Sequence, residues 1–227
     1  MKRIRQLVQT AGPYLAAAVV LVLLRSTGLA QTIDLVLYDL ITSQRAEGSG
    51  QDTPITLVGI EESDIQRFGW PIDDGLFCDA FDALNAAGVD AIGFDIYRDK
   101  GVGPNQQCLR DRFHDEPTLV SIFNVASDIG PVPGTPSERQ SYNDMSLDGD
   151  GVVRRDLVHV TGQDDATVSF PLRVLEVATG DSSLRTAMNE GRHQDAWLSA
   201  DGGGYHNEID AGLGLQRLLR FREPGSY

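Results

Sequence analysis

Apolar residues follow two alternating patterns along the middle of the chain. Short runs that are β-branched and apolar at almost every position are typical of strands buried inside a sheet. Between these runs, apolar residues recur at helical spacing. The predicted strands are residues 54–60, 89–96 and 118–125, and the predicted helices are residues 75–87 and 106–114. Since strands and helices alternate with short connections, we expect an α/β fold, a three-layer core with a largely parallel sheet and flanking helices.

The pattern is weaker in the second half of the chain. Residues 127–142 are rich in proline and predict a loop. Residues 152–160 have the composition of a strand, and residues 171–179 have that of a helix. Residues 207–222 form a weakly apolar tail that we expect to end in a strand.

The first thirty residues have a different pattern. An uninterrupted apolar run, residues 14–24, follows the cations Lys2, Arg3 and Arg5. As a helix, residues 7–24 would reach roughly 27 Å, close to the ~30 Å of a hydrocarbon core. This predicts an N-terminal transmembrane helix whose basic end stays in the cytoplasm, so that the rest of the chain is exported.

A cleaved secretory peptide is the alternative, because Gly28 and Ala30 fit the small-residue rule for cleavage. Residues 32–42 place apolar side chains at helical spacing, which favours a helix that continues from the membrane. The predicted organisation is a cytoplasmic basic start with a transmembrane helix (1–30), a juxtamembrane helix with a connector (31–53) and an extracytoplasmic domain (54–227).

The charge of the chain narrows the choice of partners. The formal net charge is −14, from 19 basic and 33 acidic residues. The first thirty positions contain four of the basic residues and none of the acidic ones. Residues 31–227 therefore contain 15 basic and 33 acidic residues, which gives them a formal net charge of −18. So acidic a domain repels phosphate backbones, and we expect no nucleic-acid partner.

The two cysteines, Cys78 and Cys108, both lie in the part predicted to be exported. An oxidising compartment would allow them to form a disulfide. Two separate free thiols are the alternative, and the sequence does not decide between them.

No residues show the spacing of a catalytic or cofactor site. The four histidines lack metal-ligand spacing, no serine or cysteine sits in a nucleophile elbow, and we expect no cofactor, no metal and no enzyme activity within this chain. Residues 144–155 resemble a calcium loop, but Arg155 stands where a bidentate acid is required. We interpret them as an Asp/Gly turn between strands.

Polar side chains follow the predicted strands, where the carboxyl ends of a parallel sheet usually form ligand crevices. We take these residues, with two from neighbouring segments, as either a sensor pocket or a structural polar cluster in which Asp95 pairs with Arg98 or Arg154. The candidates are Glu61, Glu62, Ser63, Trp70, Asp95, Arg98 and Arg154. Trp70 also fits a packing corner.

Six segments, taken in order, resemble the type-two CHASE domain, an extracellular sensory domain associated with cyclases and histidine kinases. They are Tyr38, Asp39 and Arg45 in the first exported helix, and residues 55–63, 68–71, 86–96, 148–155 and 224–227. Members of this family usually carry an aspartate at the position of Glu61 and an arginine soon after the Trp-Pro pair, whereas Ile72, Asp73 and Asp74 follow that pair here.

The resemblance implies the sensory portion of a bacterial transmembrane receptor, in the inner (cytoplasmic) membrane with its main domain in the periplasm. It implies a C-terminal cytoplasmic output absent from this chain, an adenylate cyclase before a kinase. We expect its partners to be the membrane, an unknown small-molecule or protein signal and a second copy in a homodimer. The alternative is a stand-alone membrane-anchored interaction domain without enzymatic output.

Overall fold

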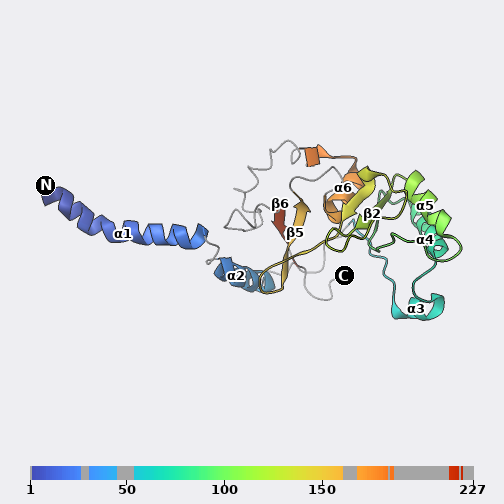
Figure 1. Ribbon diagram of the computed structural model, residues 1–227, viewed down its shortest axis with the longest axis horizontal. Coiled ribbons are helices and arrows are strands. Elements are labelled where there is room, and N and C mark those ends of the chain that lie inside the picture. The colour runs from blue at the N-terminus through green and yellow to red at the C-terminus, as the bar shows by residue number, and fades with distance from the viewer. Residues whose placement is uncertain are drawn as a thin grey trace.

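The computed structural model describes residues 2–26, 31–44, 54–160, 168–183, 185–186, 215–219 and 221. Two helices, α1 (Lys2–Ser26) and α2 (Gln31–Gln44), precede the α/β domain. Figure 1 shows α1 extending away from the domain and α2 lying next to strand β5. The helix predicted for residues 32–42 is therefore present as α2.

A parallel sheet forms the centre of the domain. Its strands are β1 (Ile92–Phe94), β2 (Leu119–Phe123) and β3 (Gln140–Tyr142), in the order β1-β2-β3. Gly93 is opposite Val120, and Ile122 is opposite Ser141. The helices are α4 (Asp74–Ala86) and α5 (Gln106–Asp115), which pack together on one face, and α6 (Phe170–Thr179) on the other (Figure 1). The predicted α/β core with flanking helices is confirmed.

Four phenylalanines fill the space between the sheet and the helices α4 and α5. Phe77 and Phe81 of α4 meet Phe94 of β1 edge to face, with ring centroids 5.0 and 5.6 Å apart. Phe113 of α5 is fully buried and meets Phe81 at 5.8 Å. Edge-to-face pairs add to the stabilisation that aromatic burial already gives, so this cluster fixes the two helices on the sheet.

The other face of the sheet admits α6 because β1 carries a glycine. A Cβ at Gly93 would lie 2.6 Å from the ring of Phe170 and 2.9 Å from Val174. The helix ends at Gly180, whose φ of 70° is left-handed and suits a glycine.

A second, antiparallel sheet stands beside the first. Its strands are β4 (Ser146–Leu147), β5 (Val153–His159) and β6 (Leu215–Leu218), in the order β4-β5-β6. Bridges from Tyr142 to Ser169 and from His159 to Val168 connect it to the parallel sheet. The strands predicted at 152–160 and at the end of the tail are present, but they belong to this separate sheet.

Two predictions for the domain are wrong. Residues 54–60 form no strand and are exposed, and they run instead to a short helix, α3 (Glu62–Phe68), none of whose residues is buried. Residues 127–142 are not simply a loop, because a 3-10 turn, η1 (Ser137–Arg139), leads into β3. β3 escaped prediction since its short, polar sequence follows a series of prolines and gains its regularity from pairing with β2.

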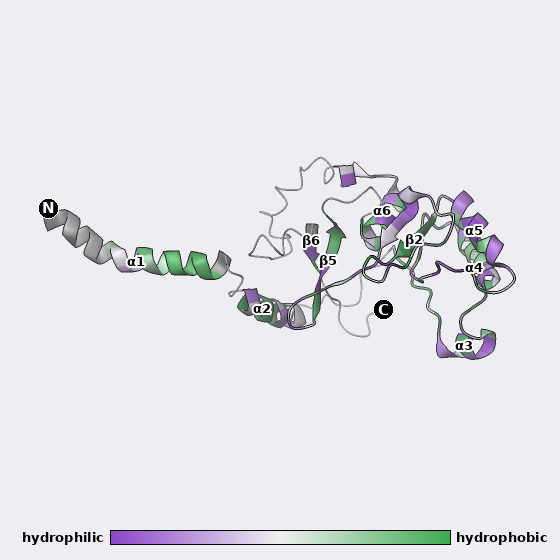
Figure 2. Ribbon diagram, viewed as in Figure 1, coloured by the Kyte–Doolittle hydropathy of each residue, from purple (hydrophilic) through white to green (hydrophobic). Residues whose placement is uncertain are grey.

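Within the described residues, the structure contains no helix that combines the length and the apolar character needed to cross a membrane. The transmembrane helix predicted within residues 1–30 is therefore not found. The uninterrupted apolar run of α1 consists of residues 14–24. Figure 2 shows this run as the apolar part of α1.

Candidate functional site

Arg154 holds the most connected polar site in the described chain. Its side chain is only 3% exposed although it carries a full charge. Around it lie Asp39 of α2 and Asp148 and Asp150 of the turn between β4 and β5, and we call these four residues the Arg154 cluster. A buried guanidinium requires such partners, because an unpaired charge away from water is strongly destabilising.

The contact between Arg154 and Asp39 is bidentate. Nε of Arg154 donates to Oδ1 of Asp39 at 2.8 Å, and Nη2 donates to Oδ2 at 2.7 Å. The planar fork of an arginine matches a carboxylate in this way and fixes their relative orientation. The pair therefore fastens the helix that precedes the domain to strand β5.

The remaining donors of Arg154 bind the turn. Nη1 donates to Asp148 at 3.0 Å and to Asp150 at 2.8 Å, and Nη2 donates to Asp150 at 2.7 Å. Asp148 also pairs with Arg155, which is itself buried. The turn and strand β5 are thus joined by charge as well as by backbone pairing.

Tyr38 gives α2 a second attachment to the same sheet. Its hydroxyl donates to the carbonyl of Leu219, directly after β6. The Leu219 N–H in turn donates to the carbonyl of Arg154 at 2.9 Å. Neighbouring residues of α2 therefore contact both β5 and the end of β6.

Hydrogen bonds from Arg154 shift the acids beside it. They lower the pKa of Asp150 to about 2, and they lower the pKa of Asp39 below its ordinary value. The same contacts raise the pKa of Arg154, with the hydrogen bond to Asp39 as the largest cause. All three groups are therefore charged across the physiological pH range.

The turn in this cluster is the segment that superficially resembles a calcium loop. Gly151 donates to the carbonyl of Asp148 at 2.8 Å and has a φ of 80°, a conformation that glycine adopts without strain. The interpretation of this segment as an Asp/Gly turn between strands is confirmed. Its carboxylates point to Arg154, and no group of His, Cys, Asp or Glu in the described part of the chain could hold a metal ion.

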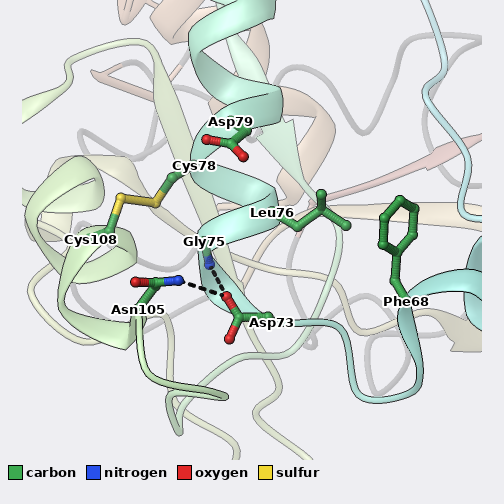
Figure 3. Close-up of a pocket in the computed structure, with 8 residues that line it drawn as sticks. All are labelled: Phe68, Asp73, Gly75, Leu76, Cys78, Asp79, Asn105 and Cys108. Carbon is green, nitrogen blue, oxygen red and sulfur yellow. Dashed lines mark hydrogen bonds between the residues drawn. A yellow bond between two sulfur atoms is a disulfide. The ribbon is translucent and has the colours of Figure 1, made fainter.

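A pocket of about 480 Å³ opens beside the start of α4 (Figure 3). Its lining residues come from α3, from α4 and the residue before it, and from the start of α5 and the residue before it. They are Phe68, Asp73, Gly75, Leu76, Cys78, Asp79, Asn105 and Cys108. Asp73 caps α4 by accepting from the N–H of Gly75 at 2.8 Å, and it accepts from Asn105 at 3.3 Å. The two carboxylates, the amide and the aromatic ring suit a neutral or cationic ligand better than an anion.

A disulfide between Cys78 and Cys108 forms one wall of this pocket (Figure 3). It joins α4 to α5, and the two half-cystines are 30 positions apart along the chain. Of the two alternatives that the sequence left open, the structure contains the disulfide.

The other candidate residues from the sequence do not gather at one edge of the sheet. Glu61, Glu62 and Ser63 lie exposed at the start of α3, where Asp64 accepts from the Glu61 N–H at 2.9 Å. Trp70 is 61% exposed and does not line the pocket.

Asp95 and Arg98 have partners other than the ones that the sequence indicated. Asp95 accepts from Asn143 at 2.5 Å, which ties the ends of β1 and β3 together. Arg98 is buried, lies 3.6 Å from Asp74 and donates to the carbonyl of Ile72 at 3.1 Å. These contacts are structural and lie within the domain, whereas Arg154 links the domain to the helix α2 that precedes it.

Sequence reasoning missed most of the residues that surround Arg154 and the pocket. Asp39 appeared only as part of the family resemblance, and Asp73, Asp79 and Asn105 carried no motif. The local sequence could have indicated Asp73 as a helix cap, because an aspartate preceding a helical pattern is a frequent N-cap.

The structure is thus an α/β domain to which a preceding helix, α2, is attached by an ion pair. A family model described as the CHASE2 domain matches residues 16–226. The chain belongs to the CHASE2 family, whose members are extracellular, non-catalytic sensory domains. No curated protein and no solved structure matched it.

Proposed function

We propose that this chain is the extracytoplasmic sensory portion of a membrane-bound bacterial signalling receptor. In this proposal it regulates a C-terminal cytoplasmic output, an adenylate cyclase before a kinase. The receptor lies in the inner membrane with its sensory domain in the periplasm, and a small molecule or a protein supplies the signal. Membership of the CHASE2 family supports the sensory role.

One observation supports signal transfer above the others, namely the bidentate pair between Arg154 and Asp39. It links α2, the helix that directly follows α1, to strand β5 of the antiparallel sheet. A displacement of β5 therefore moves α2 with it, because the planar pair allows little independent rotation. A sensory domain needs such a rigid link between its core and the helix that leads out of it.

The pocket beside the disulfide is our candidate for the signal site. It lies at the start of α4, and Phe68 of α3 forms part of its wall. An occupant would touch both the core helix α4 and the exposed segment that carries α3. We propose a neutral or cationic small molecule, since Asp73 and Asp79 line the pocket without an opposing cation.

The export of the domain is tested by fusing a reporter enzyme that folds only outside the cytoplasm to the C-terminal end of the chain in bacterial cells. We expect active reporter, and the same fusion to a chain without residues 1–30 is the control that should be inactive. An inactive reporter on the full chain would contradict the extracytoplasmic location.

The output is tested by sequencing the parent gene beyond the codon for Tyr227. The proposal requires further hydrophobic segments and a cyclase or kinase domain. A stop codon at that point would remove the output from the proposal and leave the stand-alone interaction domain as the better account.

A further inference from the structure

We infer that the free edge of β1 is the docking site for residues 54–60 of the same chain, which add to the parallel sheet as a fourth strand. In the structure these residues form neither helix nor strand and are exposed, with Leu57 77% and Val58 70% exposed. Their sequence is apolar on both faces, as in a strand that is covered on both sides.

The backbone of residues 57–60 is available for pairing. Among the described residues, none donates to or accepts from the backbone of residues 57–60. Open N–H and C=O groups in an apolar stretch such as residues 57–60 can pair with the edge of a sheet. It carries no charge that would oppose its burial.

The acceptor for the segment is the outer edge of β1. β1 is the terminal strand of its sheet and pairs only with β2 in the part of the chain that the structure describes. Ile92 donates to the carbonyl of Thr118, so Ile92 faces β2 and Gly93 directs its N–H and C=O to the opposite edge. Gly93 is exposed there.

The direction of the chain fits parallel docking. Asp74, at the start of α4, accepts from the N–H of Val102 at 2.9 Å and lies beside Arg98. Val102 and Arg98 both come after β1 in the chain, so the start of α4 lies at the carboxyl end of that strand. A parallel strand made by residues 54–60 would end at the same edge, and residues 61–73 are more than long enough to reach α4.

The handedness of the connection also fits. The chain passes from β1 through α5 to β2, and α4 packs beside α5 on the same face of the sheet. If residues 54–60 paired with the outer edge of β1, α4 would connect this new strand to β1 in the way that α5 connects β1 to β2. Both crossovers would then have the same hand, as nearly all parallel connections in one sheet do.

Residues 54–60 of the same chain are favoured over those of a second copy as the strand that pairs with β1. A tethered strand has an effective concentration in the millimolar range for a short linker, whereas two copies that each carry a net charge of −14 repel one another. Docked and undocked arrangements would give the domain the two-state element that sensing requires. That signalling role rests on the proposed function, while the docking itself does not.

Amide hydrogen exchange of the full chain in detergent micelles tests the inference. We expect the amides of residues 57–60 to exchange at least about tenfold more slowly than an unprotected backbone, at every protein concentration. Fast exchange would show that the segment stays undocked, and protection that grows with concentration would assign the edge to a second copy. Either result would overturn the inference, whatever the output of the receptor.

Two variants sharpen this test. Leu57 and Val58 point to opposite faces of a strand, so Leu57→Asp and Val58→Asp should each remove the protection, because both faces of the docked strand are covered. Leu175→Asp, on α6 and 56% exposed, is the matched control that should leave it unchanged. If only one of the two variants removed the protection, the segment would be resting on a surface by one face and would not be a strand of the sheet.

Discussion

The two sheets of this domain are held by different forces. The parallel sheet is stabilised by apolar burial, with the rings of Phe77, Phe81, Phe94 and Phe113 packed between it and two helices. The antiparallel sheet has a smaller apolar cluster of Val158, Val168 and Leu172, and it surrounds the buried charge of Arg154. The first region supplies a stable scaffold, and the second makes the connection to α2.

The difference has a consequence for sensing. Apolar packing is insensitive to direction and pH, whereas a bidentate ion pair depends on geometry and on charge. A movement of the core is thus passed to α2 at the place where the contact is most directional. The following predictions test this contrast in decreasing order of expected effect.

Phe113→Ala should destabilise the scaffold most. Phe113 is fully buried and touches two other rings, so the substitution leaves a cavity and should cost about 3–5 kcal/mol. Chemical denaturation of the full chain gives the free energy of unfolding. Phe68→Ala, at a ring that is 44% exposed, is the control and should cost less than about 1 kcal/mol.

Arg154→Met should destabilise the antiparallel region by about 2–3 kcal/mol. Removing one partner of a buried ion pair typically costs about 3–5 kcal/mol, but here Arg155 still pairs with Asp148. The same denaturation experiment measures the loss. Stability equal to that of the wild type would show that apolar packing, and not the charge cluster, holds this sheet.

Gly93→Ala should cost about 1–3 kcal/mol through overpacking. The added methyl group would meet the ring of Phe170 at 2.6 Å, so α6 must move away from the sheet. Gly149→Ala, where a Cβ meets nothing within 4 Å, provides the comparison. If both variants had the same stability, α6 would not be packed on Gly93 as described.

Asp39→Asn should cost only about 0.5–1 kcal/mol, because the Asp39 side chain is 46% exposed and water screens the pair. The amides of α2 should nevertheless exchange faster, since the helix loses its fork-to-fork contact. Asp90→Asn, an exposed acid in the turn before β1, is the control. If α2 amide exchange accelerated by a similar factor in Asp39→Asn and Asp90→Asn, Asp39 would have no specific role in holding α2.

Acid should release α2 before it unfolds the parallel core. The pKa of Asp150 is lowered to about 2 from an ordinary value of 3.8, and the pKa of Asp39 is lowered as well. Because the folded values lie below the unfolded ones, this stabilisation is complete above about pH 4 and is lost as the pH falls towards 2. Exchange of the α2 amides across this window, taken relative to the intrinsic exchange rate at each pH, should rise in the wild type and change less in the variant with Asp39→Asn and Asp150→Asn.

The contrast between the two regions also explains what the sequence predicted. The helices α4, α5 and α6 and the strands β1 and β2 were foreseen, since their burial leaves a periodic pattern in a few neighbouring residues. Residues 54–60 carry such a pattern although they are unpaired in the structure, because pairing requires contact with a neighbouring strand as well as a suitable composition.

The candidate site was less predictable for the same reason. Arg154 was chosen from the sequence, but Asp39 lies 115 positions away along the chain, and no local pattern relates two residues so far apart. The Asp/Gly turn was foreseen because its geometry is decided within four residues. Its role as a partner of Arg154 emerges only when β5 and α2 are brought together.

A double-mutant cycle between Asp39 and Arg154, measured by amide exchange of α2 in the full chain, tests the central claim most directly. If the pair fastens α2 to the domain, Asp39→Asn should accelerate exchange in the wild-type background and have almost no further effect in Arg154→Met. Equal effects of Asp39→Asn in both backgrounds, or no effect in either, would contradict the account.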